Sequence, residues 1–423
     1  MSESLIRLRD DAKQLRRAFA EPRVRFVVGL FLLAGLVILS VRLLYPAVFP
    51  SLVSDLLISV LGAVFGVYIS VELLLPYVRH VERARIDAAD EIVDSYDNPS
   101  SFLDLTALPG SRDRADVPER IPVTAEQLPS SLRSYDSFEH ELLDRQYDVP
   151  DELAALYESD ADELRALFRR ENRTNGRKVR LESASADTFE LSTTTYYRSF
   201  LTNFCPDYEL SGGATIRELS KPLLFDGETP KPLSETPFSD HFGGGGLVIT
   251  TDGRAVLPVR SRSVAVEGKA LHLSFSGSFD VADVTTGGID AALRSILTDE
   301  LDLESSSVQS VSYLGTTRRI ERLGKPDTVS LAFVDADAAL DITTEQFVNS
   351  YSVTVCDEPV SDVEDLFEPE VARQVIECLL AAIDRRPYRP SLGLLSFLWL
   401  YWELVDRLDQ HPVAEPESIE AKT

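Results

Sequence analysis

The sequence predicts an α+β fold in which an N-terminal two-helix transmembrane hairpin precedes a larger region of mixed helices and strands. Two apolar stretches, residues 26 to about 49 and residues 52–78, predict the hairpin, because each holds the roughly 20 residues that a bilayer core requires. Beyond them, β-prone runs bounded by turn residues are followed by segments of helical periodicity, which predicts both strands and helices.

The charges that flank the hairpin predict its orientation. The arm of residues 1–25 and the segment just after the second span are rich in arginine, whereas the loop between the spans carries few charges. By the positive-inside rule we expect a cell-membrane protein with two spans in the lipid bilayer, and with both termini and the soluble part in the cytoplasm. A cleaved signal peptide or a pair of buried core helices is the alternative, but no small-residue cleavage site follows the first stretch. Glu72, inside the second span, marks an oligomer contact or a pathway or, as we favour, reaches interfacial water.

The composition is strongly acidic and poor in lysine. The formal net charge is -27, from 69 acidic and 42 basic residues. This predicts a halophilic protein, because concentrated salt screens the self-repulsion of such a surface, and it argues against nucleic acid as a partner. The three cysteines lack metal-ligand spacing and the five histidines are scattered, so we expect reduced thiols and no zinc site.

Two regions of different character separate the hairpin from the centre of the chain. Residues 79–145 combine a helical stalk with a proline-rich stretch, which predicts a linker or an irregular wrapping segment. Residues 146–240 predict an α+β extension. Its expected elements are a helix over 150–170, strands at 179–182 and 188–194, and an aromatic-rich helix over 195–204, whose rings we expect in the core rather than stacked on a base.

The stretch from Gly243 to Leu303 organises the rest of the chain. Four glycines lead into an apolar strand, and Asp252-Gly253 predicts a tight hairpin turn into a return strand over 255–259. Residues 272–275 predict another short strand, which ends at Gly277. After an acidic loop, residues 290–301 have helical periodicity.

This order of elements resembles the Nudix hydrolase family over about residues 240–345. The family's box reads G-x5-E-x7-R-E-U-x-E-E-x-G-U, where U is aliphatic. Here Gly277 takes the place of the first glycine, Asp283 that of the first glutamate, residues 291–294 the start of the helix and residues 299–303 its end. The resemblance implies a Nudix-like α/β/α sandwich over 241–345. Apolar periodicity beyond it predicts C-terminal helices over 346–410, one at 369–384 and another at 391–407, and we expect a disordered tail over 411–423.

The resemblance also implies a metal site. Family members hold Mg²⁺ on helix glutamates, where it neutralises a diphosphate and activates water. This implies Mg²⁺ as cofactor, with Asp283, Asp299 and Glu300 as ligands and with Asp299 and Glu300 as catalytic residues. The family's central glutamate is absent in either alignment, because its place falls on Ser295 or on Ile296. A solvated acidic pair at a helix end is the alternative.

The basic residues of the same region predict contacts to phosphate oxygens. The densest group comprises Arg318, Arg319, Arg322 and Lys325 together with Arg260 and Arg262. An ordinary ion-paired surface explains them equally well. The predicted ligand-binding residues are Arg260, Arg262, Arg294, Arg318 and Lys325.

Three functions follow, in order of preference. The first is a membrane-anchored cytoplasmic Nudix-like protein that binds a nucleotide or other diphosphate-containing ligand with weak or no hydrolysis. The second is an active Mg²⁺-dependent hydrolase of nucleoside-diphosphate-linked substrates. The third is a non-enzymatic structural protein whose hairpin assembles partners in the membrane, and for it a homo-oligomer is left open.

Overall fold

The computed structural model describes most of the chain beyond residue 88. It covers residues 89–410 except 97–98, 113, 115–116, 171–173, 228, 262–268 and 337–346. The chain divides into two compact units, and all but a few of the described residues belong to the unit that comprises 86–259, 270–344 and 350–423. The arm, the hairpin and the tail expected at 1–25, 26–78 and 411–423 lie outside the described residues.

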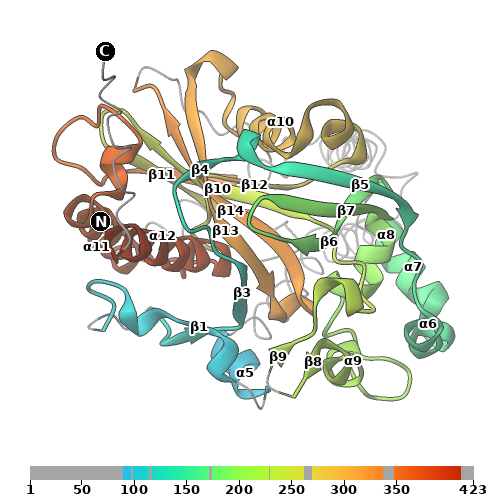
Figure 1. Cartoon of the computed structure of the whole chain (residues 1–423). Coiled ribbons are helices and arrows are strands. Elements are labelled where there is room, and N and C mark those ends of the chain that lie inside the picture. The colour runs from blue at the N-terminus through green and yellow to red at the C-terminus, as the bar shows by residue number, and fades with distance from the viewer. Residues whose placement is uncertain are drawn as a thin grey trace, which may run out of the picture. The chain divides into compact units, whose positions relative to one another are not determined.

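A mixed eight-stranded sheet forms the centre of this unit (Figure 1). Its strand order is β15-β11-β10-β14-β13-β3, with β12 paired to β10 and β4 paired to β13. The strands are β3 (Val123–Gln127), β4 (Arg133–Ser134), β10 (Gly243–Thr250), β11 (Arg254–Arg260), β12 (Phe275–Ser278), β13 (Val308–Arg319), β14 (Lys325–Val334) and β15 (Phe347–Thr354). The central strands β10 and β14 run parallel, in register from Gly243 opposite Asp327 to Thr250 opposite Val334.

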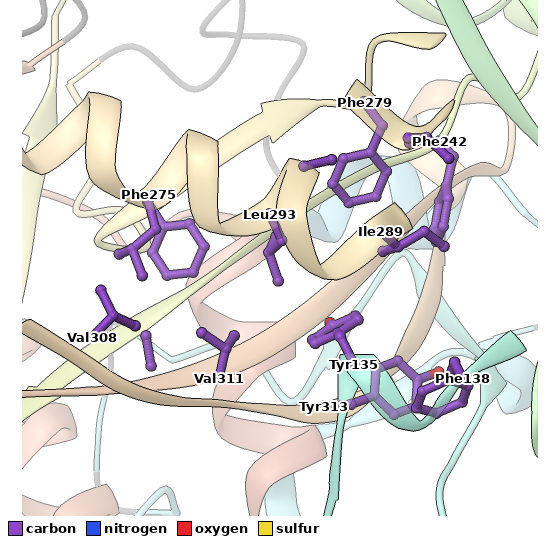
Figure 2. Close-up of a cluster of buried hydrophobic side chains, with 14 of the residues drawn as sticks. Tyr135, Phe138, Phe242, Phe275, Phe279, Ile289, Leu293, Val308, Val311 and Tyr313 are labelled. Carbon is purple, nitrogen blue, oxygen red and sulfur yellow. The ribbon is translucent and has the colours of Figure 1, made fainter. Parts of the chain in front are cut away.

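Helices cover the central strands on both faces. Every residue of β10 is buried, as expected for a strand that is enclosed from both sides. On one face lies α10 (Val281–Leu301), which bends at Gly288, where φ is 75°. Figure 2 shows Ile289 and Leu293 of α10 directed at the sheet, into a cluster that also contains Tyr313. The helix α12 (Leu392–Gln410) contacts β10, β13 and β14 and packs beside α11 (Pro369–Asp384).

The α+β extension shares the core under α10. A three-stranded sheet has the order β5-β7-β6, from β5 (Glu139–Gln146), β7 (Thr188–Thr195) and β6 (Arg177–Ala184). Val179 and Leu181 of β6 belong to the same buried cluster as Leu293 of α10. Because side chains alternate along a strand, Lys178 and Arg180 point away from this cluster.

The remaining elements surround these sheets. The helices are α5 (Ala89–Asp94), α6 (Asp151–Tyr157), α7 (Ala161–Arg170), α8 (Tyr196–Ser199) and α9 (Ile216–Leu224), and the hairpins are β1 (Leu103–Asp104) with β2 (Arg120–Ile121) and β8 (Phe225–Asp226) with β9 (Thr229–Pro230). Short 3₁₀ turns, a π-helical turn and loops join them.

Local sequence signals predicted several elements correctly. The Asp252-Gly253 turn is confirmed, with Gly253 at φ 75°, and α11 spans the expected residues. Other details differ. The expected helix over 150–170 is two helices, α6 and α7, joined by a 3₁₀ turn, and the expected acidic loop before residue 290 contains the first half of α10. The proline-rich segment expected to link or wrap contributes β3 to the edge of the main sheet.

The prediction of a two-span membrane protein requires correction. In the part of the chain that the structure describes, no helix is long and apolar enough to cross a membrane. The apolar helix α12 carries charged residues over its last two turns, and its buried side packs on protein. The fold class is therefore corrected to a mixed α+β fold with several sheets. The predicted transmembrane hairpin and the two-span cell-membrane localisation are both withdrawn.

Candidate functional site

The carboxylates predicted to hold Mg²⁺ do not converge. Asp283 lies in the first turn of α10, whereas Asp299 and Glu300 lie in its last turn, and the bend at Gly288 falls between them. Within the described residues, no group of three or more histidine, cysteine or acidic side chains is placed to hold a metal ion. The arrangement therefore does not fit one Mg²⁺ bound by all three predicted ligands, and the assignment of Asp299 and Glu300 as catalytic residues stays a prediction.

Glu300 contributes to the packing of α10 on the sheet. Its carboxylate is buried and accepts a hydrogen bond of 2.8 Å from the backbone N–H of Ser276 in β12. Next along the strand, a Cβ on Gly277 would lie only 2.9 Å from the side chain of Ile296. An apolar side chain thus occupies the position beside the glycine where one alignment places the family's central glutamate.

The predicted ligand-binding arginines do not gather at one place. Arg294 forms an ion pair of 2.8 Å with Asp290, one turn earlier on α10. Arg318 is buried, donates to the carbonyl of Lys231 and lies 3.7 Å from the Glu126 carboxylate. Arg260 is the last residue of β11, and Arg262 lies outside the described residues.

Lys325 faces the side of the sheet away from α10. A Cβ on Gly244 would meet Leu293 of α10, whereas a Cβ on Gly243 would lie 3.4 Å from the Lys325 ammonium. Since successive residues of a strand point to opposite faces, Lys325 lies across the sheet from α10.

Around Lys325 the fold assembles a group that we call the His241 cluster: His241, Ser278, Lys178, Arg322 and Lys325. His241 is fully buried, and its Nε2 lies 2.9 Å from the Ser278 hydroxyl. Lys325 forms an ion pair with Asp327, and Lys178 forms one of 2.8 Å with Asp280. Burial holds the pKa of His241 well below 6.5, and the charges of Lys325, Lys178 and Arg322 lower it further. Burial also lowers the pKa of Lys325.

Aromatic rings line the same cluster. The rings of Tyr196 and Phe204 lie 5.8 Å and 5.1 Å from that of His241, and the Arg322 guanidinium lies 5.3 Å from the Phe204 ring centre. Residues 200–204 form a π-helical turn, a rare conformation that occurs often at functional sites. Its Asn203 side chain donates to the Arg322 carbonyl at 3.1 Å, which fixes this wall of the cluster.

Of these residues, sequence reasoning had singled out Lys325 and Arg322 but missed Lys178, His241 and Ser278. No linear spacing connects the five cluster residues, because they come from three strands, a loop and a 3₁₀ turn. The run of four glycines that begins β10 was the sequence feature that could have indicated this site. Glycine permits the close approach of neighbouring chains, and a Cβ on Gly243 would lie 2.6 Å from the Gly277 carbonyl oxygen.

The neutral state of His241 makes stability depend on pH. The pKa of His241 is depressed in the folded state, so below about pH 6.5 the unfolded chain binds the proton that the folded chain rejects. His241 should therefore lower the free energy of unfolding by up to about 1.4 kcal/mol per pH unit as the pH falls from about 6.5. Urea titrations of the wild type and of His241→Gln at pH 7 and 5 should show a shallower loss for the variant. Equal pH dependence would contradict the buried neutral state.

Comparisons with known proteins identify no family. No family model matches the sequence, and no curated protein matches it. Among solved structures the chain is similar to DR0079 from Deinococcus radiodurans, at 16% identity and a TM-score of 0.23, over 33% of this chain and 83% of that one. It is also similar to a MutT Nudix hydrolase from Burkholderia pseudomallei, at 15% identity and a TM-score of 0.22, over 33% of this chain and 96% of that one. These similarities are too weak to assign a fold or a function.

Proposed function

We propose that this chain is a Nudix-like protein that binds a nucleotide or other diphosphate-containing ligand and does not hydrolyse it through Mg²⁺. The observation that carries the proposal is the packing of Ile296 against Gly277, because it puts an apolar group where one of the two alignments with the family places a metal-binding carboxylate. The placement of Asp283 at the opposite end of α10 from Glu300 supports the same conclusion.

Retention of a ligand is supported by the distribution of charge. Burying a lysine costs free energy unless a carboxylate of the protein or a bound anion balances its charge. Such a buried lysine is unusual in a chain with a net charge of -27. Lys325 is 4% exposed, forms an ion pair with Asp327 and lies near Arg322 and Arg319, which pair with the buried Glu321 carboxylate. Phosphate oxygens are the natural partners of such a group, because charge-assisted hydrogen bonds to them are strong.

The test uses the full chain at molar KCl, which screens the excess charge. It is incubated with Mg²⁺ or Mn²⁺ and a panel of nucleoside di- and triphosphates, nucleotide sugars and dinucleotides, next to Glu300→Gln. We expect no phosphate release above that of the variant, whereas at least one compound should raise the melting temperature. Phosphate release that disappears in Glu300→Gln would make the chain a hydrolase. Without release and without stabilisation by any compound, the binding function fails as well.

A further inference from the structure

Three groups of the His241 cluster come together on one face through strand register: Ser278, Lys325 and His241. Gly243 of β10 lies opposite Ser278 of β12 on one side and opposite Asp327 of β14 on the other. Residues directly opposite each other in a sheet share a face, and Lys325, two residues before Asp327, shares it too. Phe242 points the other way, into the core under α10, so that its neighbour His241 joins the same face (Figure 2).

His241 supplies an observation that the protein alone leaves unexplained. Its Nε2 forms a hydrogen bond with the Ser278 hydroxyl, but its Nδ1 is buried and has no hydrogen-bond partner among the described residues. A buried polar atom without a partner is costly, and such atoms are uncommon in native structures. When the neutral ring accepts from Ser278 at Nε2, Nδ1 carries the proton and is a donor in search of an acceptor.

The charges around this donor favour an anion. Lys178, Lys325 and Arg322 are the charged groups that depress the pKa of His241, and all three are cations. Arg322 lies 3.7 Å from the buried Glu321 carboxylate. The carboxylate partners of the two lysines, Asp280 and Asp327, instead lie toward solvent, with side chains 46% and 22% exposed. Solvent therefore reaches the ion pairs, and an incoming anion can share the ammonium groups with these carboxylates.

We infer that the His241 cluster is a binding site for a phosphate group, on the face of the sheet opposite α10. Its donors are the Lys325 and Lys178 ammonium groups and the His241 Nδ1–H, which the Ser278 hydroxyl positions by donating its own proton to Nε2. The site would hold one phosphate of the ligand proposed above, so the inference rests on that function for the ligand's identity but assigns a different place from the Nudix-like box.

The carboxylates give the site a basis for selectivity. Phosphate near neutral pH retains a P–OH group, which can donate to Asp327 or Asp280, whereas sulfate has no proton to donate. A sulfate oxygen facing either carboxylate would meet like charge without a hydrogen bond, which disfavours it. Phosphate is therefore expected to bind at least about 10-fold more tightly than sulfate, as for the loss of one charge-assisted hydrogen bond.

The test measures binding of inorganic phosphate, pyrophosphate and sulfate to the full chain by calorimetry and by melting temperature. Ser278→Ala should weaken phosphate binding about 5-fold, because His241 loses the neutral hydrogen bond that fixes its proton on Nδ1. Lys325→Met should weaken it by about 10-fold or more, as for the loss of a charged hydrogen bond. Arg294→Met is the matched control, because Arg294 was a predicted ligand-binding residue but lies on α10. It should leave the affinity unchanged.

Several outcomes would overturn the inference. Phosphate affinity that survives both Ser278→Ala and Lys325→Met, or that falls with Arg294→Met, places the site elsewhere. Since Lys325 is buried and its variant can fail to fold, Ser278→Ala decides alone if Lys325→Met is not folded by circular dichroism. If a nucleotide of the panel stabilises the chain equally with and without Ser278→Ala, the proposed function stands and this site fails. If no phosphate compound binds, both fail.

Discussion

Replacing Gly246 with valine is expected to prevent the chain from folding. A Cβ at this position would lie 2.3 Å from the Ser330 carbonyl oxygen and 2.9 Å from the Phe275 ring. Ser330 is the residue paired with Gly246 in β14, so its backbone can retreat only if the parallel pairing opens. Overpacking costs about 1–3 kcal/mol where side chains can move, and more where backbone must shift. Against a total stability of about 5–15 kcal/mol, we expect loss of the cooperative unfolding transition.

The measurement is circular dichroism during thermal and urea unfolding of Gly246→Val next to Gly212→Val. Gly212 is the matched control, because a Cβ there would have no atom within 4 Å. The control should unfold within about 0.5 kcal/mol of the wild type, as surface substitutions usually do. A cooperative, wild-type-like transition in Gly246→Val would mean that β10 and β14 are not paired as described.

Replacing Arg318 with leucine should destabilise the chain by about 3–5 kcal/mol, because it removes a buried cation from beside the half-buried Glu126 and the fully buried Asp240 carboxylates. The Arg318 side chain is 1% exposed and lies 3.7 Å from Glu126. Burial raises the pKa of Glu126, and the Arg318 charge opposes that rise. Arg318 also opposes the larger effect of burial, which raises the pKa of Asp240. Without the Arg318 guanidinium, Glu126 loses its paired cation, and Asp240 keeps only the Arg180 charge against the effect of burial.

Two comparisons separate this structural role from the ligand-binding role that the sequence suggested for Arg318. Arg165→Leu removes an exposed arginine paired at 2.8 Å with Asp162, and should change the free energy of unfolding by less than about 1 kcal/mol. Arg318→Leu with Glu126→Gln should recover part of the loss, since the uncompensated charge is gone. If Arg318→Leu instead keeps full stability and loses affinity for a nucleotide, Arg318 is a ligand contact.

Local chemistry explains which parts of the fold the sequence predicted. The Asp252-Gly253 turn requires a positive φ at one residue, and glycine supplies it. The helix α11 is predicted by the helical spacing of its apolar residues. The first half of α10 was missed because it ends in Gly287-Gly288, which is typical of a loop. Tertiary packing favours a bent helix here. A Cβ on Gly288 would lie only 2.9 Å from the His140 ring of β5, so the bend brings the backbone close to that ring.

The candidate site was harder to predict for a topological reason. Lys178, His241, Ser278 and Lys325 come from β6, the loop before β10, β12 and β14, and only the strand order brings them together. The resemblance to the Nudix box directed attention to α10, where the carboxylates do not converge. Lys325 and Arg294 lie on opposite sides of the sheet, and only the strand register shows this.

The parallel pairing of β10 with β14 also sets the order in which the chain can fold during synthesis. Gly243 pairs with Asp327, so the ribosome must make β11, β12, α10 and β13 before β10 receives this neighbour. Contacts between residues so distant in sequence form slowly, because a long loop must close first. Until β14 emerges, β10 exposes an apolar edge with four glycines and little to hold its register. A nascent chain halted before residue 325 should therefore be prone to aggregation and bound by chaperones.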